Sequence, residues 1–157
     1  MYVFMSDLGS TNHEIIQEFR QNKGKVGGYY EGQPLLLLHT KGRKSGQTRI
    51  TPLAYTQDGE RIILIGANVG SSKNPDWYYN ILAHPEVTVE IGEEHLPAIA
   101  TVLEGAERER FIADSPKAWA EAKAYYPDLP DWPIKRQQSI PVIALTLQRP
   151  SSSASLS

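Results

Sequence analysis

Six short apolar segments, each of strand length and bounded by polar turns, constrain the fold of this chain most strongly. They cover residues 35–40, 48–56, 61–67, 87–91, 96–103 and 141–147. Most are joined by tight turns, which pair strands antiparallel. Helical periodicity is found at residues 11–21, 74–83 and 105–125, with an interruption at Ser115-Pro116. The pattern predicts an α+β barrel of about six mainly antiparallel strands with peripheral helices.

Several single residues predict local structure within these segments. Pro52 lacks the N–H that a central strand needs, so residues 48–56 are expected at an edge or a bulge. Thr11 and Glu14 form a capping box for the first helix. Asn74 is expected to cap the second helix, with Pro75 at its first position. His39, inside an apolar strand, is expected to be a satisfied core residue.

The length of 157 residues fits one domain. We expect this domain to cover residues 1–149, with an N-terminal helix in 1–23 and a loop at 24–34. The serine-rich tail at 150–157 is expected to be disordered. The absence of cysteine excludes disulfides and thiolate chemistry and fits a cytoplasmic location. Residues 1–7 do not resemble a signal peptide, and the scattered histidines predict no metal site.

Charge is distributed unevenly along the chain. The net charge is −2, which argues against nucleic-acid binding. Between positions 32 and 75, however, six basic residues stand against two acidic ones. The basic residues are Lys41, Arg43, Lys44, Arg49, Arg61 and Lys73. This local positive field predicts a small anionic ligand.

The densest part of this field is the turn at residues 41–49. Its two glycines allow consecutive N–H groups to face one point, and Ser45 adds a hydroxyl donor. Arg43, Lys44 and Arg49 add charge-assisted donors. The turn is therefore a candidate phosphate site, and the alternative interpretation is a solvated basic hairpin turn.

A second candidate anion site is the loop at residues 66–74, which leaves a strand and enters a helix N-terminus. Free N–H groups and the helix dipole favour an anion there, and Lys73 adds a full charge. The alternative is simply a capped helix. We expect both loops to meet at one end of the barrel.

Aromatic residues form a third group. Trp77 and Tyr78 lie on a predicted helix, and core packing is the more common role there. Tyr126 and Trp132 lie in a proline-rich segment and are better placed to flank a planar substrate. The alternative for this pair is aromatic packing that holds an irregular loop.

The motifs together resemble the deazaflavin-dependent nitroreductase family, which binds coenzyme F420. The resemblance rests on residues 37–49 followed by Thr51-Pro52-Leu53, and on 73–80, which read KNPDWYYN. Asp58-Gly59, His84-Pro85, Tyr126-Pro127 and Ile140-Pro141-Val142 continue it. It covers about residues 24–149 and implies a split β-barrel, the fold shared with FMN-binding reductases.

The resemblance also implies a set of site residues. The cofactor-binding residues would be Arg43, Lys44, Ser45, Gly46, Arg49, Pro52, Leu53, Ala54, Asn68, Val69, Gly70, Lys73, Asn74, Trp77 and Asn80. The basic turn and the second loop would hold the phosphate and glutamate tail, and residues 52–54 and 68–70 would hold the ring. Tyr126 would be the catalytic residue, in a substrate pocket with Leu129 and Trp132. The nitroreductase branch has tyrosines at the last two positions and at that of Ala54.

The implied function is an F420H2-dependent reductase that transfers a hydride to an electron-poor quinone, enone or nitro compound. The alternatives are an FMN- or pyridoxal-phosphate-binding barrel oxidase and a non-catalytic F420-binding or storage protein. The expected partner is a small-molecule electron acceptor and no nucleic acid. Barrels of this kind often form homodimers. The polar N-terminal helix allows at most weak contact with a membrane surface, peripheral at the inner face of the cell membrane.

Overall fold

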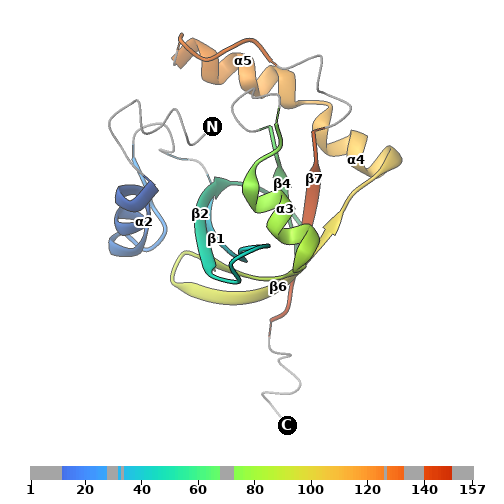
Figure 1. The fold of residues 1–157 in the computed structure, drawn as a ribbon. Helices are drawn as coiled ribbons and strands as arrows, with labels where there is room; N and C mark the ends of the chain where they lie inside the picture. The colour runs from blue at the N-terminus through green and yellow to red at the C-terminus, as the bar shows by residue number, and fades with distance from the viewer. Residues whose placement is uncertain are drawn as a thin grey trace.

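The structure is a computed structural model that describes residues 12–27, 32, 34–67, 73–125, 127–132 and 140–149. Within these residues the helices are α2 (Asn12–Gln21), α3 (Asp76–Ala83), α4 (Gly105–Ile112) and α5 (Ser115–Tyr125). The strands are β1 (Leu35–Lys41), β2 (Thr48–Ala54), β3 (Thr56–Asp58), β4 (Arg61–Ile65), β5 (Glu86–Ile91), β6 (Glu94–Val102) and β7 (Val142–Leu147). Figure 1 shows the helices outside and across a curled sheet.

The seven described strands form one antiparallel sheet in the order β2-β1-β5-β6-β7-β4-β3. β2 and β3 lie at opposite ends of this order, although only Tyr55 separates them in the chain. Since consecutive Cα atoms are about 3.8 Å apart, the two edges of the sheet must converge. The sheet therefore curls into a half-barrel, and the predicted α+β split barrel is confirmed.

The structure divides the strand predicted over residues 48–56 into two strands, β2 and β3. The backbone N–H of Tyr55 donates to the carbonyl of Pro34 at 3.2 Å, where the ladder with β1 ends. The chain then joins β4 as β3, so seven strands replace the six expected. Pro52 of β2 lies opposite Leu37 of β1. β2 is an edge strand, as the missing N–H of Pro52 predicts.

The barrel interior holds the main hydrophobic core, and α3 covers one side of it. Trp77 and Ile81 are four residues apart, so they share one face of α3, and both belong to the interior cluster. The strands contribute Leu36, Leu38, Leu53, Ile62, Leu64, Val87, Val89, Leu96, Ala98, Ala100, Ile143, Leu145 and Leu147. Core packing is thus the observed role of Trp77, which is 6% exposed.

Two further clusters cover the outer face of the sheet. On one side, Ile15 and Phe19 of α2 pack against Leu35 and Leu37 of β1. This explains why β1 is apolar at successive positions, because its odd-numbered leucines face α2 and its even-numbered ones face the interior. On the other side, Ile112 of α4 packs in a cluster with residues of β4 and β7.

The helix ends largely follow the sequence signals. α3 ends before His84-Pro85 as predicted, and the break between α4 and α5 lies at Ala113-Asp114, two residues before the expected Ser115-Pro116. Pro116 instead lies in the first turn of α5, where its missing N–H needs no partner. The predicted cap Thr11 and the tail 150–157 lie outside the described residues.

Among the described residues, no helix combines the length and the apolar character needed to cross a membrane.

Candidate functional site

The basic turn between β1 and β2 is closed by its own hydrogen bonds. The N–H of Gly42 donates to the carbonyl of Gln47 at 2.8 Å, and the N–H of Gly46 donates to the carbonyl of Gly42 at 2.9 Å. The N–H of Gln47 donates to the Ser45 hydroxyl at 3.1 Å. Gly46 has φ +72°, which favours glycine. These three amides bond within the turn and are not available to an external phosphate, and the predicted convergence of the turn's other N–H groups on such a group stays a prediction.

The positive side chains of the turn, in contrast, remain available. Lys44 and Arg49 are exposed, and neither forms an ion pair with a described carboxylate. Every described arginine outside the turn is in an ion pair, namely Arg20, Arg61, Arg108, Arg110 and Arg149. Arg43 and Arg49 are the exceptions within the described chain. The turn therefore presents cations that an external anion can neutralise, and anion binding would depend on side chains.

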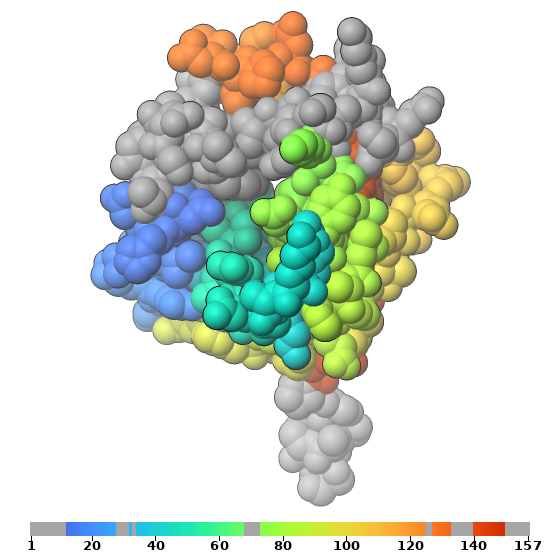
Figure 2. Space-filling view, in the orientation of Figure 1, coloured from blue at the N-terminus to red at the C-terminus, as the bar shows by residue number. Residues whose placement is uncertain are grey.

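The turn is attached to α3 beside it. The N–H of Arg43 donates to Oδ1 of Asn80 at 3.1 Å, and the Arg43 guanidinium lies 5.1 Å from the centre of the Tyr79 ring. In Figure 2 the cyan turn lies directly against the green segment that contains α3. α3 rises about 1.5 Å per residue, so Asn80 is only about 6 Å along the axis from the first helical residue. The turn and the start of α3 thus lie on the same side of the barrel.

The start of α3 differs by one residue from the prediction. The helix begins at Asp76 with Pro75 as its N-cap, and Pro75 provides no side-chain cap. Asn74 is therefore not the N-cap, because the extended backbone that a cap requires is adopted by Pro75. Lys73 is exposed next to this helix end. The predicted residues Asn68, Val69 and Gly70 lie outside the described residues.

Gly66 marks a close approach near this helix end that sequence reasoning missed. A Cβ at Gly66 would lie 2.8 Å from Cγ of Pro141 and 3.4 Å from Cδ of Pro75. Its N–H donates to the carbonyl of Pro141 at 2.9 Å. The end of β4, the segment before β7 and the start of α3 therefore meet at one point. The second candidate loop leaves the barrel here.

The residues predicted beside the cofactor ring are mostly buried. Leu53 is 4% exposed and fills the barrel interior together with Trp77, while Ala54 packs toward α2. Both polar atoms of the Asn80 amide bond to protein groups, since Nδ2 also donates to the Thr40 hydroxyl at 3.1 Å. Trp77 and Asn80 thus make their observed contacts within the protein. A direct contact of either residue with the deazaflavin ring stays a prediction.

The predicted substrate segment contacts Trp119 of α5, both through its backbone and through its own Trp132. Leu129 is buried, and the Trp119 indole N–H donates to the carbonyl of Pro130 at 2.6 Å. The ring centres of Trp119 and Trp132 are 5.7 Å apart in an edge-to-face arrangement. Nε1 of Trp132 is buried and has no hydrogen-bond acceptor among the described residues. Tyr126, the predicted catalytic residue, lies outside the described residues.

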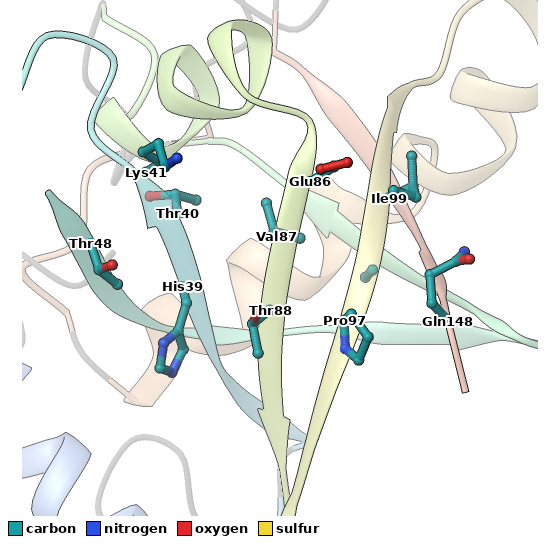
Figure 3. Close-up of a pocket in the computed structure, with 11 residues that line it drawn as sticks. His39, Thr40, Lys41, Thr48, Glu86, Val87, Thr88, Pro97, Ile99 and Gln148 are labelled. Carbon is teal, nitrogen blue, oxygen red and sulfur yellow. The ribbon is translucent and has the colours of Figure 1, made fainter. Parts of the chain in front are cut away.

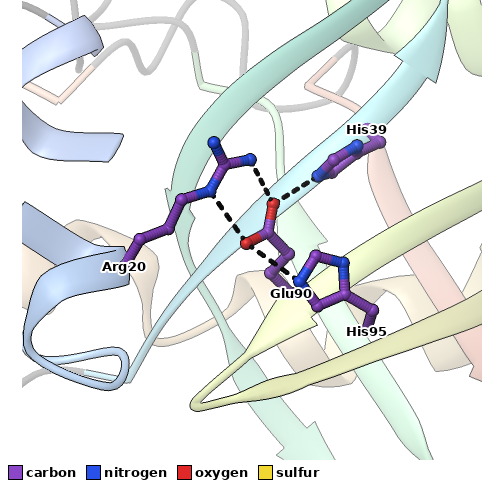
Figure 4. A network of polar contacts seen from close by, with 4 residues as sticks. All are labelled: Arg20, His39, Glu90 and His95. Carbon is purple, nitrogen blue, oxygen red and sulfur yellow. Dashed lines mark hydrogen bonds and ion pairs between the residues drawn. The ribbon is translucent and has the colours of Figure 1, made fainter. Parts of the chain in front are cut away.

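A buried carboxylate network lies between α2 and the outer face of the sheet (Figure 4). Glu90 of β5 is 2% exposed and accepts from Nε and Nη2 of Arg20 at 3.1 and 2.7 Å. Nε2 of His39 lies 2.6 Å from Glu90, and Nε2 of His95 lies 3.5 Å away. His39 is thus satisfied as predicted, although it is partly exposed. No described residues form a cluster of three ligands that could hold a metal.

The physical role of this network is to fasten α2 to the sheet. Burial raises the pKa of Glu90, but the hydrogen bonds from Arg20 and His39 outweigh burial, so that the pKa is lowered. Glu90 therefore stays ionised at neutral pH. The sequence offered no signal for this pair, because Arg20 and Glu90 are 70 positions apart.

An open depression of about 470 Å³ lies on the outer face of β1, β5 and β6 (Figure 3). Its rim includes Lys41 and Thr48, at the two ends of the basic turn, together with Glu86, Thr88 and Gln148. None of the residues predicted by the resemblance to bind the cofactor or the substrate lines it. Its mixture of one lysine and one glutamate favours neither an anion nor a cation.

Comparison with known proteins identifies the family. The family description "F420H(2)-dependent quinone reductase" matches residues 12–146. A Mycobacterium tuberculosis protein named for this activity is 31% identical over 118 residues, which cover 75% of this chain and 93% of the relative. A second protein of that species, an F420H(2)-dependent quinone reductase, is 35% identical over 89 residues, covering 56% of this chain and 58% of the relative.

Solved structures agree with this result. The structure of an F420-H2 dependent reductase has a TM-score of 0.51 and 33% identity, covering 71% of this chain and 93% of that one. A structure described as a domain-swapped dimer has a TM-score of 0.53 and 28% identity, covering 90% and 98%. These matches confirm the resemblance that the motifs indicated. The chain belongs to the F420H(2)-dependent quinone reductase family, a family of oxidoreductases.

Proposed function

We propose that this chain binds reduced coenzyme F420 and catalyses hydride transfer to an electron-poor quinone. The observation that carries the proposal is the basic turn, whose arginines and Lys44 lack described carboxylate partners while all other described arginines have one. An anionic tail of phosphate and glutamates would supply those partners. The donor set therefore fits the charged end of this cofactor.

When bound, F420 in its reduced form supplies the hydride from C5 of the deazaflavin. The role of the chain is to hold the ring and the acceptor in one orientation. A quinone that gains one hydride and one proton becomes a hydroquinone, and solvent can provide the proton. Enones and nitro compounds are acceptors by the same chemistry, and we include them in the proposal as secondary substrates.

The proposed binding role is tested by titrating the purified protein with F420, FMN and FAD. We expect F420 to bind and the two flavins to bind weakly. Adding menadione to the complex of the protein with reduced F420 should then restore the absorbance of oxidised F420 in proportion to the quinone consumed. A yellow protein that releases FMN on heating would instead favour an FMN-binding oxidase. F420 binding without turnover of any quinone or enone would favour a storage protein.

We further propose that the acceptor lies against Trp132. The Trp132 ring packs against the hydrophobic cluster formed by α4, β4 and β7. Ala67, near the start of the second candidate loop, packs against the same cluster. A buried donor without a partner costs about 1–3 kcal/mol, so such a group calls for an explanation. A carbonyl oxygen of a bound quinone would accept from Nε1 and remove this cost, provided that the side chains that cover Nε1 move aside on binding.

Trp132→Phe keeps the ring and removes the N–H. We expect kcat/KM for menadione to fall roughly tenfold, with F420 affinity unchanged. The free energy of unfolding should stay equal or rise, because a buried donor that no described residue accepts from is gone. Trp119→Phe is the matched control, since it loses a bond within the protein and should lower stability. An unchanged kcat/KM for Trp132→Phe would remove Trp132 from the acceptor site.

A further inference from the structure

Asn80 forms a bridge between the strand that leads into the basic turn and the turn itself. Its Oδ1 accepts from the N–H of Arg43, and its Nδ2 donates to the hydroxyl of Thr40, both at 3.1 Å. Asn80 is 5% exposed and Thr40 is 2% exposed. One amide thus satisfies two buried or half-buried groups that belong to different parts of the β1–β2 hairpin.

The turn needs such an anchor. Its internal hydrogen bonds give it a fixed shape, and the pairing of Lys41 with Thr48 fixes its base. Neither determines how the turn tilts relative to the barrel. Among the described residues, the polar contact that ties the turn to α3 is the bond from Arg43 to Asn80, beside the ring contact of Arg43 with Tyr79.

We propose that Asn80 is a positioning residue that sets the direction of the basic turn toward the anionic tail of the cofactor. The inference rests on the proposed F420 binding. Asn80 acts through Arg43 and not by touching the tail, because its side chain is buried and both of its polar atoms bond to protein groups. A fixed turn orders the backbone that carries Lys44 and Arg49 before the ligand arrives, which reduces the entropy cost of binding.

The test compares two ligands, F420 and a deazaflavin nucleoside that lacks the phosphate and the glutamates. Asn80→Ala should raise the Kd of F420 about tenfold while the Kd of the nucleoside changes less than twofold. Thr40→Val removes the partner of Nδ2 alone and should have a smaller effect in the same direction. Asn22→Ala, at an exposed position after α2, is the control and should change neither Kd.

Amide hydrogen exchange provides a readout that needs no ligand. The Arg43 amide should be protected in the parent protein and exchange faster in Asn80→Ala, while the amides of β1 keep their protection. Equal Arg43 exchange in both proteins, or an equal loss of affinity for F420 and the nucleoside, would overturn the inference. Failure of the parent protein to bind F420 would instead contradict the proposed function, and the exchange result would still decide whether Asn80 fixes the turn.

Discussion

Replacing Lys44 and Arg49 together with alanine is expected to weaken F420 binding by about 2–4 kcal/mol, or roughly 30- to 1,000-fold in Kd. Both side chains are exposed and have no described carboxylate partner. They therefore need not break an internal ion pair before they bind an anion. Fluorescence or calorimetric titration with F420 measures the loss directly.

The expected loss is electrostatic, so it should depend on salt. The affinity of the parent protein should fall as ionic strength rises, and that of the double variant should fall less steeply. Lys25→Ala with Lys117→Ala removes the same charge from exposed positions outside the turn and should leave Kd nearly unchanged. If the Lys44 and Arg49 variant binds as tightly as this control, the basic turn is only a surface hairpin.

Replacing Glu90 with glutamine is expected to lower the free energy of unfolding by about 2–3 kcal/mol at neutral pH. The change removes the negative charge that pairs with Arg20. It also places the amide NH2 of glutamine, a donor, against the donors of the guanidinium. We expect less than the full cost of an unpaired buried charge, because the Arg20 side chain is 46% exposed and regains water. Urea denaturation measures the difference.

The pH dependence follows from the direction of the Glu90 pKa shift. The pKa is lowered in the folded protein, so the ion pair contributes its full stability above the unfolded value of about 4.3. This contribution is lost as pH falls through the folded pKa, and the stability difference between parent and Glu90→Gln should shrink below about pH 4. Glu94→Gln, which breaks the exposed pair with Arg149, should cost less than about 1 kcal/mol. A Glu90 effect no larger than this one would contradict the assigned role.

Local patterns were enough to predict most of the fold. Runs such as Leu35 to Leu38 specify strands by their composition, and the tight turns between them specify antiparallel pairing. Pro52 predicted an edge position or a bulge, and β2 is an edge strand, while His84-Pro85 predicted the end of α3. These signals are contained in a few adjacent residues. The split at Tyr55 has no such signal, since it depends on how far the sheet curls.

The candidate site could be predicted only at the level of residue types. Composition indicated that the turn is basic, but the structure shows that the amides of Gly42, Gly46 and Gln47 bond within the turn and that the side chains of Lys44 and Arg49 have no described carboxylate partner. Asn80 was predicted to contact the cofactor, whereas its amide bonds to Thr40 and Arg43. Such contacts between distant segments depend on tertiary packing. The cofactor and substrate roles of all the predicted site residues stay predictions, and Asn68, Val69, Gly70 and Tyr126 lie outside the described residues.

The position of α3 has a consequence for any random mutagenesis of this protein. The same short helix seals the hydrophobic interior through Trp77 and Ile81 and holds the basic turn through Asn80. A substitution that loosens the packing around Trp77 would therefore also disturb the position of the basic turn, because Trp77 and Asn80 are less than one helical turn apart. A genetic screen for cofactor-deficient clones should return substitutions deep in the barrel as readily as substitutions among the exposed cations.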